Sequence, residues 1–163
     1  MPTLPQLIEE DMQRLDGALD EFIGQTDATA AMVIDKGGFL ITHKGDSSKF
    51  DMTTIGALAS GAFMANQTIA ALVNEPNFNS VYQQGERSSM FVVNIDEHCL
   101  LIVIFSATIG VGVVKYYAAA AIKKIAGQLA VARNRNPGGG LDLSALNIAD
   151  SENLFKKKRR KSP

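Results

Sequence analysis

The chain has 163 residues, 46 % of them hydrophobic, which is enough for one domain with its own core and a tail. Its net charge of −1 includes six positive charges in residues 156–161, so the remainder of the chain carries −7. This mildly acidic body argues against a nucleic-acid-binding domain, and the single cysteine excludes an internal disulfide framework and favours a reducing cytoplasm.

The first predicted helix begins at Pro5, because proline suits the first turn, and Gly24 is expected to end it. Its apolar residues recur at three- and four-residue spacing: Ile8, Met12, Leu15, Leu19 and Phe22. We expect the Asp and Glu residues of this segment to lie on its solvated side. Acidic residues also stand where a signal peptide needs lysine or arginine, so we expect a soluble, cytoplasmic protein that is not exported.

A hairpin follows, with apolar runs at 30–34 and 39–42 around the Asp-Lys-Gly-Gly turn at 35–38. Later runs predict an edge strand at 80–84 and two stronger strands at 90–95 and 100–105. The last of these has no alternation, so both of its faces should be buried. Cys99 begins that run, which favours a buried thiol over a nucleophile.

Residues 52–74 carry no charge and read as one long helix with Asp51 as N-cap and Pro76 as the terminator. Phe50 and Ile55 are placed to pack as a hydrophobic staple. One side is expected to lie on the protein's own sheet: Ile55, Leu58, Ala62, Ile69, Leu72 and Val73. The other side must meet another protein or a second copy: Ala57, Gly61, Met64, Ala65, Thr68 and Ala71.

A final helix follows Gly110 and Gly112, with Val114, Ala118, Ala121, Ile122, Ile125 and Leu129 on one face. These elements predict a single α+β domain at residues 1–135, in the order α-β-β-α-β-β-β-α. A five-stranded antiparallel sheet would carry the long middle helix on one face and the other two helices on the opposite face. Residues 136–163 are expected to form a flexible Gly-rich linker and a basic tail.

This order resembles the roadblock (dynein light chain) superfamily, and within it the bacterial polarity regulators, over about residues 5–135. The order and spacing of several stretches carry the resemblance together. These are VIDKGG at 33–38, ALASG at 57–61, NEPNF at 74–78, GERSS at 85–89, LIVIF at 101–105, TIGVGVVK at 108–115 and, in the tail, DSENLF at 150–155.

The resemblance implies a homodimer with a sheet continuous across two subunits and the two middle helices side by side as a platform. A Ras-like small GTPase would bind there in its GTP state. The dimer would stimulate hydrolysis without an arginine finger, acting in cell polarity or motility at a cell pole. Ala57, Gly61, Met64, Ala65 and Thr68 would carry the contact, although close relatives keep very small residues where this chain has Met64 and Thr68.

Other functions remain open. The chain can be a dimeric adaptor that binds without altering hydrolysis, and burial by a homodimer partner alone can explain the uncharged helix. A heterodimer with a paralogous chain and a small-molecule sensor are further alternatives. We expect no catalytic residues, metal site or cofactor, because His43 and His98 lack zinc-ligand spacing and Gly110-Val-Gly112 lacks a phosphate-loop lysine.

The basic tail also has two interpretations. Its side chains can bind anionic lipid, nucleic acid or an acidic protein through electrostatics, or they can form a solvated end that improves solubility. They are Lys156, Lys157, Lys158, Arg159, Arg160 and Lys161. The preceding segment, 141–155, has enough apolar residues to dock on something. Arg133 and Arg135 can reach a partner's phosphate, or they can cap or solvate the helix end.

Overall fold

The computed structural model describes residues 4–135, and its elements follow the predicted order. The fold class predicted from the sequence is confirmed. The predicted linker and tail, 136–163, lie outside the described residues. The elements are α1 (Glu9–Thr26), β1 (Ala30–Asp35), β2 (Leu40–Gly45), the short 3-10 turn η1 (Ser47–Lys49), α2 (Met52–Leu72), β3 (Ser80–Gln83), β4 (Ser88–Asn94), β5 (Cys99–Ser106) and α3 (Val111–Arg135).

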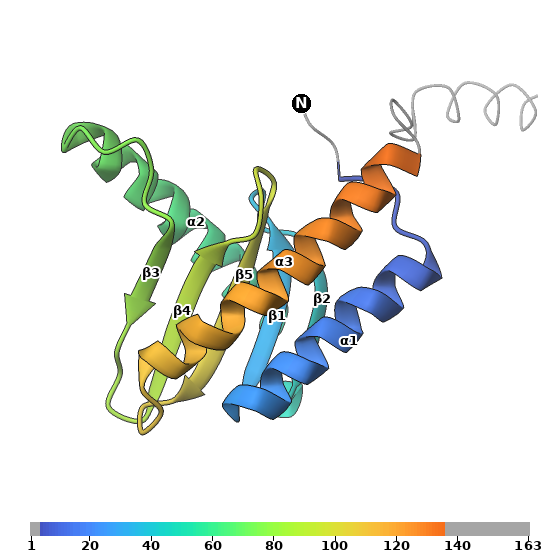
Figure 1. The fold of residues 1–163 in the computed structure, drawn as a ribbon. Coiled ribbons are helices and arrows are strands. Elements are labelled where there is room, and N and C mark those ends of the chain that lie inside the picture. The colour runs from blue at the N-terminus through green and yellow to red at the C-terminus, as the bar shows by residue number, and fades with distance from the viewer. Residues whose placement is uncertain (1–3, 136–163) are drawn as a thin grey trace, which may run out of the picture.

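The five strands form one sheet in the order β2-β1-β5-β4-β3, and every neighbouring pair is antiparallel. Helices α1 and α3 cover one face of this sheet and α2 covers the other (Figure 1). The central strand β5 is buried along all but its last residue, because both of its faces lie under helices. This confirms the prediction made from its lack of alternation.

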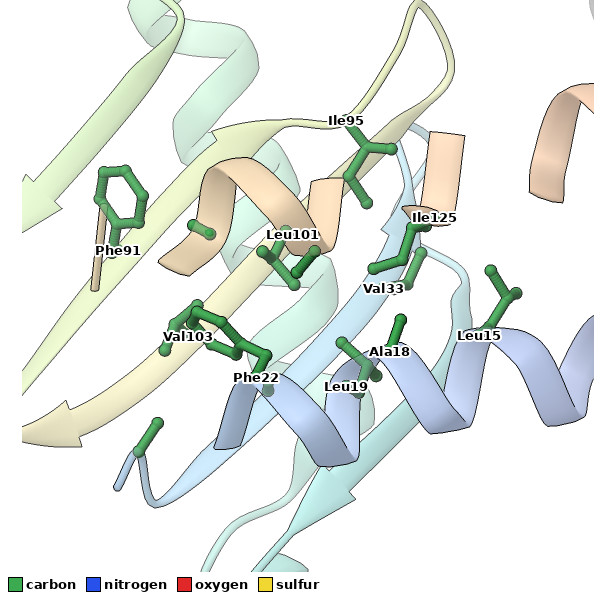
Figure 2. Packing of buried hydrophobic residues seen from close by; sticks show 14 of the residues in the cluster. Leu15, Ala18, Leu19, Phe22, Val33, Phe91, Ile95, Leu101, Val103 and Ile125 are labelled. Atoms are coloured by element: carbon green, nitrogen blue, oxygen red, sulfur yellow. The ribbon is translucent and has the colours of Figure 1, made fainter. Parts of the chain in front are cut away.

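The larger core lies between the sheet and the α1–α3 layer. This core includes Leu15, Leu19 and Phe22 of α1 with Leu101 and Val103 of β5, and all five side chains are fully or almost fully buried (Figure 2). Burying each side chain of this size contributes roughly 1.5–3 kcal/mol. The apolar spacing that predicted α1 is therefore the spacing that attaches it to the sheet.

The second core layer lies between α2 and the opposite face of the sheet. Phe63 belongs to this layer together with residues of the sheet that include Met32, Ile34 and Ile102. Gly56 permits a close approach, because a Cβ atom there would lie 3.1 Å from Cγ2 of Ile34. The buried residues of α2 are thus one methionine, one phenylalanine and four small residues: Met52, Gly56, Ala59, Ser60, Phe63 and Ala70.

The sequence-based assignment of the α2 faces was wrong on the sheet side. Leu58 is 70 % exposed and Leu72 is 79 % exposed, while Ala62, Ile69 and Val73 are also exposed. Only Ile55 of the expected sheet-facing set packs on this layer, and it is half-buried. Phe63 and the small residues determine the rotation of the helix, because they allow its backbone to lie close to the strands.

The ends of α1 also differ from the prediction. Pro5 lies before the helix, which begins at Glu9 because the Asp11 side chain accepts a hydrogen bond from the Ile8 backbone N–H at 2.9 Å. Gly24 lies inside the helix. The chain leaves the helix at Asp27, which adopts a left-handed conformation with φ of 60°.

The beginning of α2 was predicted correctly and its end was placed two residues too far along the chain. Asp51 is the N-cap, and its carboxylate accepts hydrogen bonds from the backbone N–H and the hydroxyl of Thr54. These bonds hold the pKa of Asp51 below its ordinary value, with the hydroxyl as the largest cause. The helix ends at Leu72, before Asn74 turns left-handed at φ 59°.

Candidate partner-binding surface

Five residues predicted to contact a partner lie together on the outer side of α2. All five are exposed, and we call them the platform: Ala57, Gly61, Met64, Ala65 and Thr68. At 3.6 residues per turn, Gly61 and Thr68 lie on the side of the helix opposite the buried Phe63 and Ala70. Met64 is the largest side chain of the set and is 46 % exposed.

A second apolar surface adjoins the platform along the same helix. It consists of the misassigned residues Leu58, Ala62, Ile69, Leu72 and Val73, and we call it the shoulder. A small hollow that includes Ala62, Asn66, Val81 and Met90 in its lining places Ala62 of the shoulder on the side of α2 toward β3 and β4. Strand β3 forms an edge of the sheet.

Platform and shoulder together form an uncharged surface, because no residue from Met52 to Leu72 carries a charge. A partner that covers this surface removes no charged group from water, so the desolvation cost is low. Exposed apolar patches of this kind mark interaction sites. Among residues 4–135, α2 is also the one helix long and apolar enough to span a membrane, a test that a core helix of a soluble protein also passes.

The position of α2 is fixed by contacts at several places along its length. The Ser60 hydroxyl donates a hydrogen bond to the Lys36 carbonyl at 2.7 Å, and Gly38 (φ +96°) lies so near Ala57 that a Cβ atom would be 3.3 Å from its Cα. Farther along, the Gln67 amide donates to the Phe78 carbonyl at 2.7 Å. The platform is therefore a preformed surface, which lowers the entropic cost of binding.

The two arginines near the end of α3 are occupied by carboxylates of this chain. Arg133 donates to Oδ2 of Asp96 at 3.1 Å, and both Nη atoms of Arg135 donate to Asp11 at 2.7 and 3.0 Å. Asp11 has no exposed surface, so the prediction that every acid of α1 is solvated was wrong for this residue. The Arg135 guanidinium holds the pKa of Asp11 well below its usual range.

The described residues hold little that could perform covalent chemistry. Cys99 is fully buried, and burial raises its pKa to about 12, which makes it a poor nucleophile. Within residues 4–135, no group of three His, Cys, Asp or Glu side chains is placed to hold a metal ion. The arrangement on α2 can bind a partner and position it, without contributing a reactive group.

Comparison with known families agrees with this arrangement. The sequence profile of the Roadblock/LC7 domain matches residues 15–105, which run from α1 to the end of β5. The chain belongs to the Roadblock/LC7 family. A search of curated proteins found no match.

Solved roadblock structures include several that superimpose well on this domain. The gliding protein MglB from Thermus thermophilus is 29 % identical, covers 79 % of this chain and 98 % of its own, and has a TM-score of 0.72. An MglB structure described as having a tetrameric arrangement is 28 % identical, with coverage of 81 % and 99 % and a TM-score of 0.75. Myxococcus xanthus MglB, at 22 % identity, has a TM-score of 0.73 with coverage of 78 % and 96 %, and shares the fold.

Proposed function

We propose that this roadblock protein is a homodimeric regulator that binds a Ras-like small GTPase of the MglA type in its GTP state and stimulates hydrolysis. It would act in cell polarity or motility, in the cytoplasm and at a cell pole. The observation that carries the proposal is the uncharged, exposed outer side of α2. The likeness to MglB structures, one of them named a gliding protein, supports it.

Two adjoining surfaces on one helix suit two different partners. Ala62 of the shoulder lies toward β3, so a second copy bound to the shoulder could also pair with that edge of the sheet. Such an arrangement leaves both platforms exposed and near each other, forming a wider surface for the GTPase. Isologous pairing of this kind is the commonest geometry of protein dimers.

Stimulation of hydrolysis would act through positioning. The platform has no charged or nucleophilic group, and Arg133 and Arg135 are held by Asp96 and Asp11. The roadblock dimer would therefore supply no arginine finger and would instead hold the GTPase's own catalytic groups in their reactive geometry. Correct orientation of reacting groups can by itself remove a large part of a barrier.

The test uses two variants, each of which replaces one exposed helical glycine with arginine, on opposite faces of the molecule. A Cβ atom at Gly61 or at Gly17 would meet nothing within 4 Å, so either helix can accept the larger residue. Gly61→Arg places a charge on the platform, whereas Gly17→Arg places it on α1. Size exclusion with light scattering, using the Ras-like GTPase of the same genome with a GTP analogue or GDP, measures the complex, and turnover measures activation.

We expect wild type and Gly17→Arg to bind only the GTP form and accelerate hydrolysis, and Gly61→Arg to lose both activities. Unchanged binding by Gly61→Arg would show that the platform is not the contact. If wild type binds no GTPase in either state, the proposed partner is wrong.

A second candidate function is a dimeric adaptor that binds partners without altering hydrolysis. Met64 and Thr68 favour it, because the resemblance to the bacterial polarity regulators implies very small residues at these two positions of the platform. In that case the complex forms with either nucleotide and turnover stays at its basal rate. The double variant Met64→Ala with Thr68→Ala tests their influence, since restored activation would identify the two side chains as the obstacle.

A further inference from the structure

On the face of the sheet opposite α2, a groove lies between α1 and α3. The two helices are side by side there (Figure 1), and the groove between them has a volume of about 670 Å³. It is lined by Arg14, Ala18 and Glu21 of α1 and by Ala120, Lys123, Lys124, Gly127 and Gln128 of α3. Neither the platform nor the shoulder contributes to this groove.

The lining combines small residues with three basic side chains and one acidic side chain. Ala18, Ala120 and Gly127 leave room for a chain to approach the helix backbones. Arg14 pairs with Glu10, and Lys124 pairs with Glu21, but both pairs are exposed and therefore contribute little. Within residues 4–135, Lys123 forms no ion pair. The groove therefore fits an apolar segment that carries acidic side chains.

We propose that residues 141–155 of the same chain dock in this groove. The segment lies outside the described residues, and its sequence has the required character. It carries three acidic residues, Asp142, Asp150 and Glu152, and no lysine or arginine. Its apolar residues are Leu141, Leu143, Leu146, Ile148, Leu154 and Phe155. Charge and apolar content thus complement the basic walls and small residues of the groove.

The length of the chain allows the docking. Arg135, the last described residue, is fixed to α1 through Asp11, so the segment starts from a defined point beside the groove. Gln128 lies about 10 Å back along α3 at 1.5 Å per residue. Residues 136–140, Asn-Pro-Gly-Gly-Gly, can span up to roughly 17 Å and contain three glycines for the reversal.

The short tether also explains how weak contacts can suffice. A segment joined through five residues has an effective concentration in the millimolar range at a neighbouring site, so a low intrinsic affinity still fills the groove. The docked segment would occupy the face opposite the platform. Partner binding on α2 would therefore leave it in place.

Paramagnetic relaxation in the full-length protein tests the docking. Cys99 is fully buried and its thiol pKa is raised, so a cysteine introduced by Ser144→Cys can be labelled selectively with a nitroxide. We expect loss of the amide signals of Lys123 and Gly127 in the groove, and retention of those of Gly61 and Thr68 on α2. Ser151→Cys gives a second label position.

Charge reversal tests the complementarity. The double variant Arg14→Glu with Lys123→Glu should restore the groove signals, whereas Lys115→Glu, an exposed lysine of α3 outside the groove, should leave them quenched. Raised salt should act like the double variant. Groove signals that stay intact with both labels would overturn the proposal. A second result would also overturn it: quenching of the groove signals only in a mixture of spin-labelled protein and isotope-labelled protein without the spin label. In that case the segment would dock on another molecule.

Discussion

Asp11 is a carboxylate without exposed surface, and the partners around it explain why it can be buried. It accepts hydrogen bonds from Arg135, from the Gln128 amide at 2.6 Å and from the Ile8 backbone N–H. A buried charge is tolerated when it is paired and its lone pairs are satisfied. One side chain thereby starts α1 and ties it to the last turn of α3.

The pH dependence of stability should report this carboxylate. Arg135 holds the pKa of Asp11 below the unfolded value of about 4, so the unfolded chain takes up its proton first as the pH falls. The contribution of ionised Asp11 to the free energy of unfolding is complete above the unfolded pKa and is lost as the pH falls below it. We expect Asp11→Asn to lower Tm by roughly 5 °C at pH 7 and by less at pH 3. Thermal unfolding of both proteins at the two pH values measures the difference, and a gap that is equal at both contradicts the assignment.

Cys99 provides a second measurement at the scale of one residue. Its side chain is fully buried and its pKa is raised to about 12, so almost none of it is thiolate at pH 8. We expect a thiol reagent to label the native protein about a thousandfold more slowly than the urea-unfolded protein. Labelling at the same rate in both conditions would place Cys99 at the surface.

At the scale of elements, strands were easier to predict than helix orientation. Continuous apolar runs located β4 and β5 to within about two residues, because a sheet covered on both faces needs such runs. The rotation of α2 was not predictable from hydrophobicity, since almost every position of this uncharged helix is acceptable in a core. Packing shape decided it: Gly56 and Ala59 lie on the sheet and Leu72 does not.

The candidate site was predicted in part. The platform residues lie away from the core as expected, while their role in binding stays a prediction. The burial of Asp11 could not be inferred from α1 alone. Its main partner, Arg135, is 124 positions away in the sequence, and only the packing of α1 against α3 brings the two together.

A pair of truncations tests the orientation of α2. Phe63 is 2 % exposed, and Phe63→Ala should lower the free energy of unfolding by about 3–5 kcal/mol through the cavity it leaves. Leu58→Ala, on the shoulder, should change it by less than about 0.5 kcal/mol. Both values are measured by urea unfolding at the lowest workable protein concentration, so that association of chains does not add to the free energy of unfolding. If Leu58→Ala lowered the free energy of unfolding more than Phe63→Ala, Leu58 would face the sheet, as expected from the sequence.

At the scale of the whole molecule, the two sheet faces have different surfaces. The α1–α3 face carries exposed charges in ion pairs such as Arg14–Glu10, whereas α2 shows none. The C-terminal part of α2 extends past the sheet (Figure 1), and there Ile69, Leu72 and Val73 are all exposed. A single copy in water leaves this apolar end uncovered, which favours association through the shoulder.

The proposed dimer can be tested through that end of α2. Ile69 is 49 % exposed, and Val131 on α3 is a matched control at 51 %. Light scattering of wild type and Val131→Arg should give twice the 17.5 kDa of one chain. Ile69→Arg should shift the mass toward one chain, because two shoulders facing each other would bury two like charges. Unchanged helix content by circular dichroism would show that the variant still folds. A wild type that scatters as one chain, or an Ile69→Arg that keeps the wild-type mass, would exclude the shoulder as the dimer interface.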